Sequence, residues 1–473
     1  MAASVEVFVS DQRGRGYKTT TEIKSGELIM KAKPFVYVLC NNERGKRCDH
    51  CFHSRGTLLR CSSCKFARYC NVKCQRLAWL DHKAECGSLK AVAPRVPTDS
   101  VRLVARLLNK LRDSYRDEET KQGIKEFKFL QSHTDELSEE RRRQFSQMMF
   151  VLQQCVEEEV LNDLSSDLLA IFGRMVSNSF SVCDAEMKPI GVAIYPKVSL
   201  LNHSCDANCV AVFNGTEILI RSVRKLQQGE ECFMSYIEVM SSTQERKQQL
   251  KEQYYFECDC QVCQNIEQDK KKQALKCSSM ACSEMVLPDD SGGFIVCAGC
   301  SSRHDKSHSK TVTELVEKIK DSLTVIETLK KQQNIKKILE LCEEHLKSCE
   351  RVLHECNIYA VQLLDAAMDA CIDLQQWKSA LKYGIKTILP YRLHYPACHP
   401  NVGVQLMRIG KLQLFLSHLQ DAEKSLQQAR EIIHTTHGSS HPLSKELERL
   451  YCECREELQV EMIDQLDLQD YDL

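Results

Sequence analysis

Apolar and polar positions along the 473-residue chain predict a β-rich unit that is interrupted by an insertion and later resumed. Residues 1–40 contain the short runs VEVFV, GYKTT, ELIMKA and FVYVL, which predict strands separated by turns at RGRG and KSGE. Residues 99–175 carry apolar residues at helical spacing, as in SVRLVARLLNKL. Strand-like segments, VAIYPKVSLL, CVAVFNG and EILIRSV, return between Gly191 and Tyr236.

Residues 311–460 are predicted to be helical throughout and to contain a repeat. Comparing this segment with itself at an offset of 42 residues brings similar residues into register. The matching positions are Ile335, Trp377 and Leu419, then Ile338, Ala380 and Ala422, and finally His399-Pro400 with His441-Pro442. This spacing favours helix hairpins slightly longer than tetratricopeptide units, with small residues where helices approach closely. A chance match among apolar helical residues is the alternative.

Composition narrows the class of protein. The chain has 64 Lys and Arg against 65 Asp and Glu, so the overall charge does not favour nucleic-acid binding, and any basic surface is local. No run approaches the roughly 18 apolar residues that span a bilayer, and the first residues lack a signal-peptide core. We therefore expect a soluble, intracellular protein without membrane partners. In a reducing compartment its 27 cysteines more often bind metal than form disulfides.

Residues 48–86 carry eight potential metal ligands in four closely spaced pairs, and they are too short and polar to bury an adequate core. Two-residue gaps let a turn aim both thiolates at one ion, and three-residue gaps suit one helical turn. Alternating pairs predict two tetrahedral zinc sites, the first formed by Cys48, Cys51, Cys70 and Cys74 and the second by Cys61, Cys64, His82 and Cys86. Buried structural thiols without metal are the alternative.

A separate cysteine set lies further along the chain, at Cys277, Cys282, Cys297 and Cys300. Its gaps are four, fourteen and two residues, and the intervening turn is marked by PDDSGG. On spacing alone this set predicts a closed zinc knuckle.

Several of these runs resemble known modules. CDHC, CSSC, ARYCNVKC and AWLDHKAEC resemble a MYND zinc finger. SLLNHSCDANC and GEECFMSY resemble the SET domain of protein-lysine methyltransferases, RGRGYKTTTEIKSGEL resembles its opening cofactor loop, and YFECDCQVC resembles its post-SET cysteines. Together they cover nearly the whole chain and point to the SET-and-MYND family. The family pattern Asn-His-Ser-Cys-x-Pro-Asn has proline where this chain has Ala207, which loosens the loop but removes no reacting group.

The resemblance implies an α+β multidomain fold: a β-rich SET domain split by a MYND zinc finger and a helical insert, followed by a post-SET zinc segment and an all-α tetratricopeptide-like domain. The expected boundaries are 1–47 for the N-terminal part of the SET domain, 48–86 for MYND, 99–175 for the insert, 176–255 for the catalytic core, 256–305 for the post-SET segment with the extra knuckle, and 311–473 for the helical domain.

The resemblance also implies the activity, an S-adenosylmethionine-dependent protein-lysine N-methyltransferase of the histone-lysine type, and its site residues. Tyr236 would orient the lysine amine and the methyl group, while Phe180 and Tyr254 would wall the lysine channel. The residues expected at the cofactor are Arg15, Gly16, Asn178, Ser199, Leu201, Asn202, His203, Tyr236 and Phe256, with His133 as a weaker candidate that is equally well a surface histidine. The four cysteines expected to bind a third zinc are Cys205, Cys258, Cys260 and Cys263.

Methyl transfer explains why these residue types belong together. The attacking lysine amine must be neutral although its reference pKa is roughly 10.4, and both an apolar aromatic channel and a nearby sulfonium cation favour the neutral form. The rate enhancement would come from positioning the amine and the methyl group, without a covalent intermediate. Two other readings stay open: an idle adaptor in which MYND and the helical repeats recruit partners, and a DNA-binding regulator.

By resemblance, the substrates include histone tails and non-histone proteins such as signalling kinases, as expected of a chromatin regulator in cytoplasm and nucleus. Residues 41–90 hold eleven Lys and Arg against four Asp and Glu, so a basic surface remains around the finger. That surface would dock proline-containing peptides or DNA, or it is only a solvated face. Chaperone docking on the helical domain is one option. We expect a monomer with three zinc ions, or four if the Cys277 set also binds zinc.

Overall fold

The computed structural model describes residues 4–112, 117–279, 281–288, 295–304 and 306–470. The chain forms two compact units. Unit 1 comprises Met1–Asn202, Asn208–Met234 and Leu250–Phe256, and unit 2 comprises His203–Ala207, Ser235–Gln249 and Glu257–Leu473.

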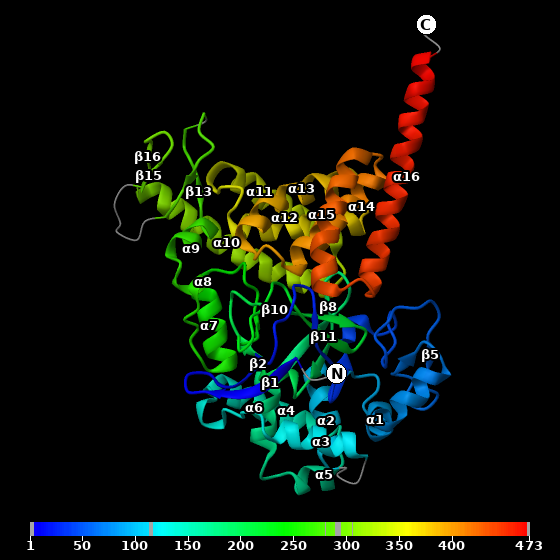
Figure 1. Ribbon diagram of the computed structural model, residues 1–473. Helices are drawn as coiled ribbons and strands as arrows, with labels where there is room; N and C mark the ends of the chain where they lie inside the picture. Colours follow the sequence, from blue (N-terminus) through cyan, green and yellow to red (C-terminus); the bar gives the residue numbers. More distant parts are fainter. Residues whose placement is uncertain (1–3, 113–116, 280, 289–294, 305, 471–473) are drawn as a thin grey trace. The chain divides into compact units, whose positions relative to one another are not determined.

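Unit 1 contains the β-rich part of the chain, in short antiparallel sheets (Figure 1). Its strands are β1 (Val5–Ser10), β2 (Gly14–Thr19), β3 (Leu28–Ala32), β4 (Val36–Leu39), β7 (Ser179–Cys183), β8 (Pro189–Ile194), β10 (Cys209–Asn214), β11 (Glu217–Ser222) and β12 (Phe233–Met234), with β9 (Asn202–His203) at its boundary. β3 pairs with β11, and β4 pairs with β8, so strands from the start of the chain join strands more than 150 residues later. This pairing confirms that the β-unit is interrupted and resumed.

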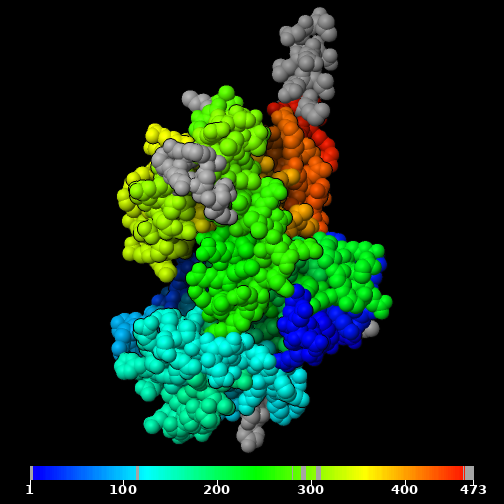
Figure 2. Space-filling model, turned by 90° about the vertical axis from the view of Figure 1, so that its left-hand side faces the viewer, coloured from blue at the N-terminus to red at the C-terminus, as the bar shows by residue number. Residues whose placement is uncertain are grey.

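The interruption in unit 1 consists of the cysteine-rich finger and a set of helices. The finger has β5 (Leu59–Arg60), β6 (Arg68–Tyr69) and α1 (Val72–Ala91), and the helices are α2 (Asp99–Arg112), α3 (Glu118–Lys128), α4 (Glu139–Leu152), α5 (Glu158–Asp163) and α6 (Leu168–Asn178), with short 3-10 turns η1 (Asn41–Glu43) and η2 (Thr134–Glu136). Buried residues of α2, including Leu107, form one core with Val38 of β4 and Ile194 of β8. The helices therefore pack on the sheet as a continuous body, whose cyan and teal surface is seen in Figure 2.

Unit 2 contains the post-SET segment and the helical domain. Its first elements are most of α7 (Thr243–Tyr254), whose residues from Leu250 onward belong to unit 1, and then α8 (Gln261–Gln264), α9 (Ile266–Lys272), β13 (Leu275–Lys276), β14 (Met285–Val286), β15 (Ile295–Val296) and β16 (Arg303–His304). The helical domain consists of α10 (Lys306–Lys331), α11 (Ile335–Val352), α12 (Ile358–Asp373), α13 (Trp377–His394), α14 (Pro400–Phe415), α15 (Leu419–His437) and α16 (Pro442–Asp470), stacked side by side in Figure 1.

The 42-residue repeat is confirmed by the helix boundaries. Ile335, Trp377 and Leu419 are the first residues of α11, α13 and α15. The two His-Pro pairs open α14 and α16, where proline suits the first helical turn because that turn needs no amide donor. The small residues Ala380 and Ala422 are fully buried where the helices meet.

Three local predictions differ from the structure. The strand expected to run to Leu201 ends at Ile194, because Pro196 cannot donate to a strand ladder, and a 3-10 turn η3 (Val198–Leu200) follows. The RGRG run is not all turn: Gly14, at φ +70°, begins β2, so Arg15 and Gly16 lie in a strand. Cys70 precedes α1 instead of sharing its first turn with Cys74. Among the described residues, no helix is long and apolar enough to cross a bilayer.

Candidate active site and zinc centres

The finger in unit 1 gathers its eight ligands into two sets of four. Cys48, Cys51, Cys70 and Cys74 form one set, and Cys61, Cys64, His82 and Cys86 form the other. In each set the ligand atoms lie within 4.8 Å of one another, as a tetrahedral zinc ion requires. These are the alternating pairs that the spacing predicts.

Local structure fixes the ligands of the finger. The side chain of Asn71 caps α1 by accepting a hydrogen bond from the backbone N–H of Cys74 at 2.8 Å, which places that thiol at the start of the helix. His82 and Cys86 lie one turn apart inside α1, so both face the same side of the helix. The ring of buried Tyr69 packs edge-on against His82, with centroids 6.2 Å apart.

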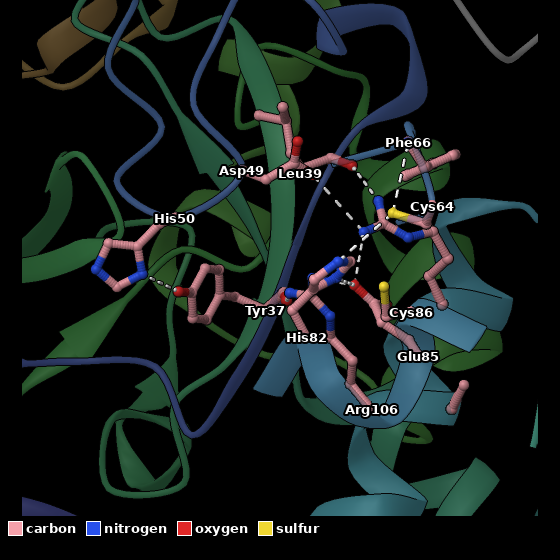
Figure 3. Close-up of polar contacts among 12 residues, drawn as sticks. Tyr37, Leu39, Asp49, His50, Cys64, Phe66, His82, Glu85, Cys86 and Arg106 are labelled. Atoms are coloured by element: carbon pink, nitrogen blue, oxygen red, sulfur yellow. Dashed lines mark hydrogen bonds and ion pairs between the residues drawn. The ribbon is translucent and has the colours of Figure 1, made fainter. Parts of the chain in front are cut away.

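Behind His82 lies a buried ionic cluster that the sequence analysis missed (Figure 3). Nδ1 of His82 lies 3.1 Å from Oε1 of Glu85, which leaves Nε2 directed toward the thiolates. The same oxygen accepts hydrogen bonds from Arg106 Nη2 at 2.5 Å and from Arg102 Nη2 at 3.3 Å. The arginines also donate to carbonyls of β4, Arg106 to Tyr37 at 2.6 Å and Arg102 to Leu39 at 3.5 Å.

This cluster keeps Glu85 ionised although it is buried. Burial alone would raise the pKa of the carboxyl group, but Arg106, Arg102 and His82 outweigh it and hold the pKa well below its usual range. A carboxylate that bonds the second nitrogen of a metal-binding histidine fixes its tautomer and ring orientation. The only signal in the sequence is the three-residue spacing from His82 to Glu85 on one helical face.

In unit 2, Cys205 meets the post-SET cysteines Cys258, Cys260 and Cys263, and their sulfur atoms lie within 4.8 Å of one another. This set was expected from family resemblance alone. A zinc ion with four thiolates carries a net charge of about -2.

Two buried cations face this charge. Arg246 donates to Cys263 Sγ at 3.5 Å and is 1% exposed. Lys272 is 2% exposed and donates to the carbonyls of Val239 and Ser241, while burial and the nearby Arg246 lower its pKa to about 8. No pattern in the sequence marked either residue.

The fourth set, Cys277, Cys282, Cys297 and Cys300, also brings its sulfur atoms within 4.8 Å of one another. Two short antiparallel ladders, β13 with β14 and β15 with β16, carry these cysteines. Most of the PDDSGG turn between them lies outside the described residues. The knuckle is tied to the helical domain: the N–H of His354 donates to the Ala274 carbonyl at 3.1 Å, and Lys276 Nζ donates to the Glu350 carbonyl at 2.8 Å.

We therefore predict that purified protein contains about four zinc ions per chain. Replacing both Cys297 and Cys300 with serine is expected to lower the content by about one ion, because two of the four thiolates of the knuckle are lost. Elemental analysis of the native protein and the variant measures this directly. A native content of three ions, unchanged in the variant, would contradict a metal site at the knuckle.

Two residues expected at the cofactor, Gly16 and Asn202, lie together within unit 1. A Cβ atom placed on Gly16 would lie 2.7 Å from Asn202 Nδ2 and 2.9 Å from Glu231 Oε1. Glycine is thus needed here because these side chains pack directly against it, and not for a turn as the sequence suggested. An amide and a carboxylate are polar groups of the kind that suit the amino-acid part of S-adenosylmethionine, which carries an ammonium group.

Three other cofactor candidates of unit 1 donate side-chain hydrogen bonds to backbone carbonyl groups. Arg15 donates to the Phe129 carbonyl, Asn178 Nδ2 donates to the Arg174 carbonyl at 2.9 Å, and Ser199 Oγ donates to the Tyr195 carbonyl at 3.2 Å. Leu201 is buried. Phe256 is the last residue of the segment Leu250–Phe256, which belongs to unit 1.

His133 is not a solvent-facing side chain. Its ring stacks on Tyr255 with centroids 4.7 Å apart and an interplanar angle of 21°, and its Nδ1 lies 2.7 Å from Glu136 Oε1. Both His133 and Tyr255 adopt positive φ, at 50° and 63°. The stack joins the helical insert to the segment just before Phe256, so His133 remains a cofactor candidate.

The expected channel residues Phe180 and Tyr254 also belong to unit 1. Phe180 packs edge-on against buried Tyr195, with centroids 5.5 Å apart. Burial raises the pKa of Tyr254 to about 12, which keeps its hydroxyl group neutral. Both residues thus offer uncharged aromatic surface.

His203 and Tyr236 lie together in unit 2. The backbone N–H of Tyr236 donates to His203 Nδ1 at 3.1 Å, and the two rings are 5.2 Å apart. Burial lowers the pKa of His203 to about 4, so the imidazole is neutral near pH 7 and can accept this bond. The histidine therefore fixes the backbone from which the Tyr236 hydroxyl group projects.

These features can promote nucleophilic substitution by an uncharged amine. S-adenosylmethionine, when bound, supplies an electrophilic methyl group. In unit 1, Phe180 and Tyr254 offer uncharged aromatic surface of the kind that favours the neutral form of a lysine amine. In unit 2, Tyr236 carries a hydroxyl group of the kind that can orient an amine. The interrupted β-unit, the zinc finger and these residue types are those that a SET-type protein-lysine methyltransferase with a zinc finger would have.

Comparisons with known proteins agree. The model of the MYND finger matches residues 48–86. Histone-lysine N-methyltransferase SMYD3 from Homo sapiens is 38% identical over 95% of this chain and 97% of its own length, and N-lysine methyltransferase SMYD2 from Gallus gallus is 31% identical over 94% and 96%. Among solved structures, the SET domain of LSMT bound to lysine and AdoHcy aligns with a TM-score of only 0.34, which carries no weight here. The chain belongs to the SET-and-MYND family of S-adenosylmethionine-dependent protein-lysine methyltransferases.

Proposed function

We propose that this protein methylates lysine side chains of histone tails and of non-histone proteins, including signalling kinases, in cytoplasm and nucleus. The observation that carries the proposal is its whole-length similarity both to a relative named as a histone-lysine methyltransferase and to one named as an N-lysine methyltransferase. Because the chain resembles both kinds, neither histone nor non-histone substrates are favoured over the other.

Within this proposal, Tyr236 orients the amine and the methyl group, and Phe180 and Tyr254 wall the lysine channel. The partly buried aromatic ring of Tyr254 supports its role, since apolar surroundings favour the neutral form of a lysine amine. Asn202 and the backbone at Gly16 receive the amino-acid part of the cofactor, a role supported by their close approach, which only glycine permits.

The finger is the proposed docking site for proline-containing peptides. Its helix α1 exposes apolar side chains, with Leu77 at 54% and Leu80 at 57% exposure, beside basic residues such as Arg76 and Lys83. Apolar side chains at three-residue spacing present one surface to a partner. We also propose that the stacked helices of unit 2 dock a chaperone segment.

A labelled-methyl assay tests the activity and its substrates. Purified protein is incubated with S-adenosylmethionine labelled on the methyl group, together with core histones in one reaction and cell extract in another. Lysine labelling in both reactions is the expected result. Labelling in extract alone would overturn the histone part of the proposal. An idle adaptor would bind S-adenosylhomocysteine, or nothing, and transfer no label to either mixture.

A further inference from the structure

Glu231 lies at the centre of the polar group around Gly16, although no sequence pattern assigned it a role. Its Oε1 accepts a hydrogen bond from Asn202 Nδ2 at 2.8 Å. Its Oε2 lies 3.7 Å from Arg13 Nη1, and the carboxylate side chain is 15% exposed. The carboxylate is thus mostly shielded from water and placed against a residue expected to contact the cofactor.

We infer that Glu231 is a positioning residue, which orients the Asn202 amide so that its carbonyl oxygen Oδ1 is presented to the α-ammonium group of S-adenosylmethionine. A carboxylate can only accept hydrogen bonds, so the amide must turn its NH₂ group toward Glu231. The carbonyl oxygen then points away from the carboxylate. An ammonium group can only donate, and a fixed carbonyl oxygen is therefore its proper partner.

The backbone at Glu231 is itself held rigidly, which this role requires. The carbonyl of Glu231 accepts from Asn208 Nδ2 at 2.8 Å, and Asn208 Oδ1 accepts from the N–H of Phe233 at 2.8 Å. Asn208 is 2% exposed. Two bonds of one buried amide thus hold the backbone that directly follows the Glu231 side chain.

Gly16 supports the same inference from the other side of the group. Any side chain at Gly16 would collide with both the Asn202 amide and the Glu231 carboxylate, at 2.7 and 2.9 Å. The glycine therefore lets its own backbone lie directly against the one hydrogen bond that sets the amide orientation. Arg13 forms an ion pair with the carboxylate through Oε2, so Oε1 is the oxygen that accepts from the Asn202 amide.

The inference rests on the proposed cofactor site, and two ligands separate it from a merely structural role. S-adenosylhomocysteine carries the α-ammonium group, whereas 5′-deoxy-5′-methylthioadenosine lacks the amino-acid part. In Glu231→Gln the new amide can donate as well as accept, so Asn202 loses its fixed orientation. Calorimetry is expected to show about tenfold weaker binding of S-adenosylhomocysteine and less than about twofold weaker binding of the methylthio nucleoside. Equal losses for both ligands would overturn the inference.

Two further variants make the outcomes distinguishable. Glu217→Gln removes another carboxylate of unit 1, which pairs with Lys31 at 2.8 Å, and it is expected to leave the binding of both ligands unchanged. Asn202→Ala is expected to weaken S-adenosylhomocysteine at least as much as Glu231→Gln. If Asn202→Ala binds normally, the proposed cofactor site is wrong. If Asn202→Ala is weakened while Glu231→Gln is not, the site stands and only the positioning role of Glu231 fails.

Discussion

Tyr236→Phe is expected to lower kcat for lysine methylation by about 100-fold, because the hydroxyl group that orients the amine and the methyl group is removed while the ring remains. The backbone N–H of Tyr236 is bonded to His203, and the variant keeps that bond. The free energy of unfolding and the affinity for S-adenosylhomocysteine are therefore expected to change little. Steady-state kinetics with a labelled methyl donor measure the effect.

A second tyrosine of unit 2 provides the matched control. Tyr383 donates its hydroxyl hydrogen to Glu343 at 3.0 Å within the helical domain. Tyr383→Phe removes the equivalent hydroxyl group from a tyrosine that has no proposed role in methyl transfer. The kcat of this variant is expected to stay within about twofold of the native value. Full activity in Tyr236→Phe, or equal losses in both variants, would remove Tyr236 from the catalytic role.

The features that sequence predicted best are those with a fixed spacing imposed by chemistry. Four donors around one zinc ion impose short gaps within pairs, so the two sets of the finger and the knuckle set emerged from spacing alone. Helix repeats have a constant length, which is why Ile335, Trp377 and Leu419 marked the helix starts. The joining of Cys205 to the post-SET cysteines has no such signal, since more than 50 residues separate them, and only family resemblance suggested it.

Residues that support the ligands were missed for a common reason. Arg102 and Arg106 lie in α2, whose pattern reads as an ordinary amphipathic helix, and nothing local shows that these two arginines face inward. Arg246 is likewise a single charged residue among many, and Glu231 lies in the GEECFMSY run, where only Tyr236 was given a role. Their roles depend on partners from distant parts of the chain, which sequence spacing does not encode. Pro196 is the converse case. Proline has no N–H to donate to a strand ladder, so this single residue already indicates that the strand ends before it.

Glu85→Ala is expected to lower the free energy of unfolding by about 3–5 kcal/mol, since it leaves Arg106 buried without its carboxylate partner and Arg102 with only Asp49, whose Oδ1 lies 3.7 Å away. The side chains of both arginines are less than 10% exposed, so water cannot replace the lost carboxylate. The milder variant Glu85→Gln keeps the shape and is expected to weaken zinc binding at the His82 set by 10- to 100-fold, because His82 loses its charged partner. Denaturant unfolding and competition with a chelating dye measure the two effects.

Asp81→Ala tests whether the effect belongs to the buried cluster or to any ion pair between α1 and α2. Asp81 lies on the same helix as Glu85 and pairs with Lys110 of α2 at 3.5 Å, but its side chain is 29% exposed. Water screens such a pair, so its loss is expected to cost less than about 1 kcal/mol and no zinc. If Asp81→Ala and Glu85→Ala lower the free energy of unfolding by similar amounts, the burial of Glu85 does not make its ion pairs more stabilising. A large cost for Glu85→Ala alone would mean that the carboxylate fastens the zinc finger to β4 through two arginines, making the finger a structural part of unit 1 as well as a docking module.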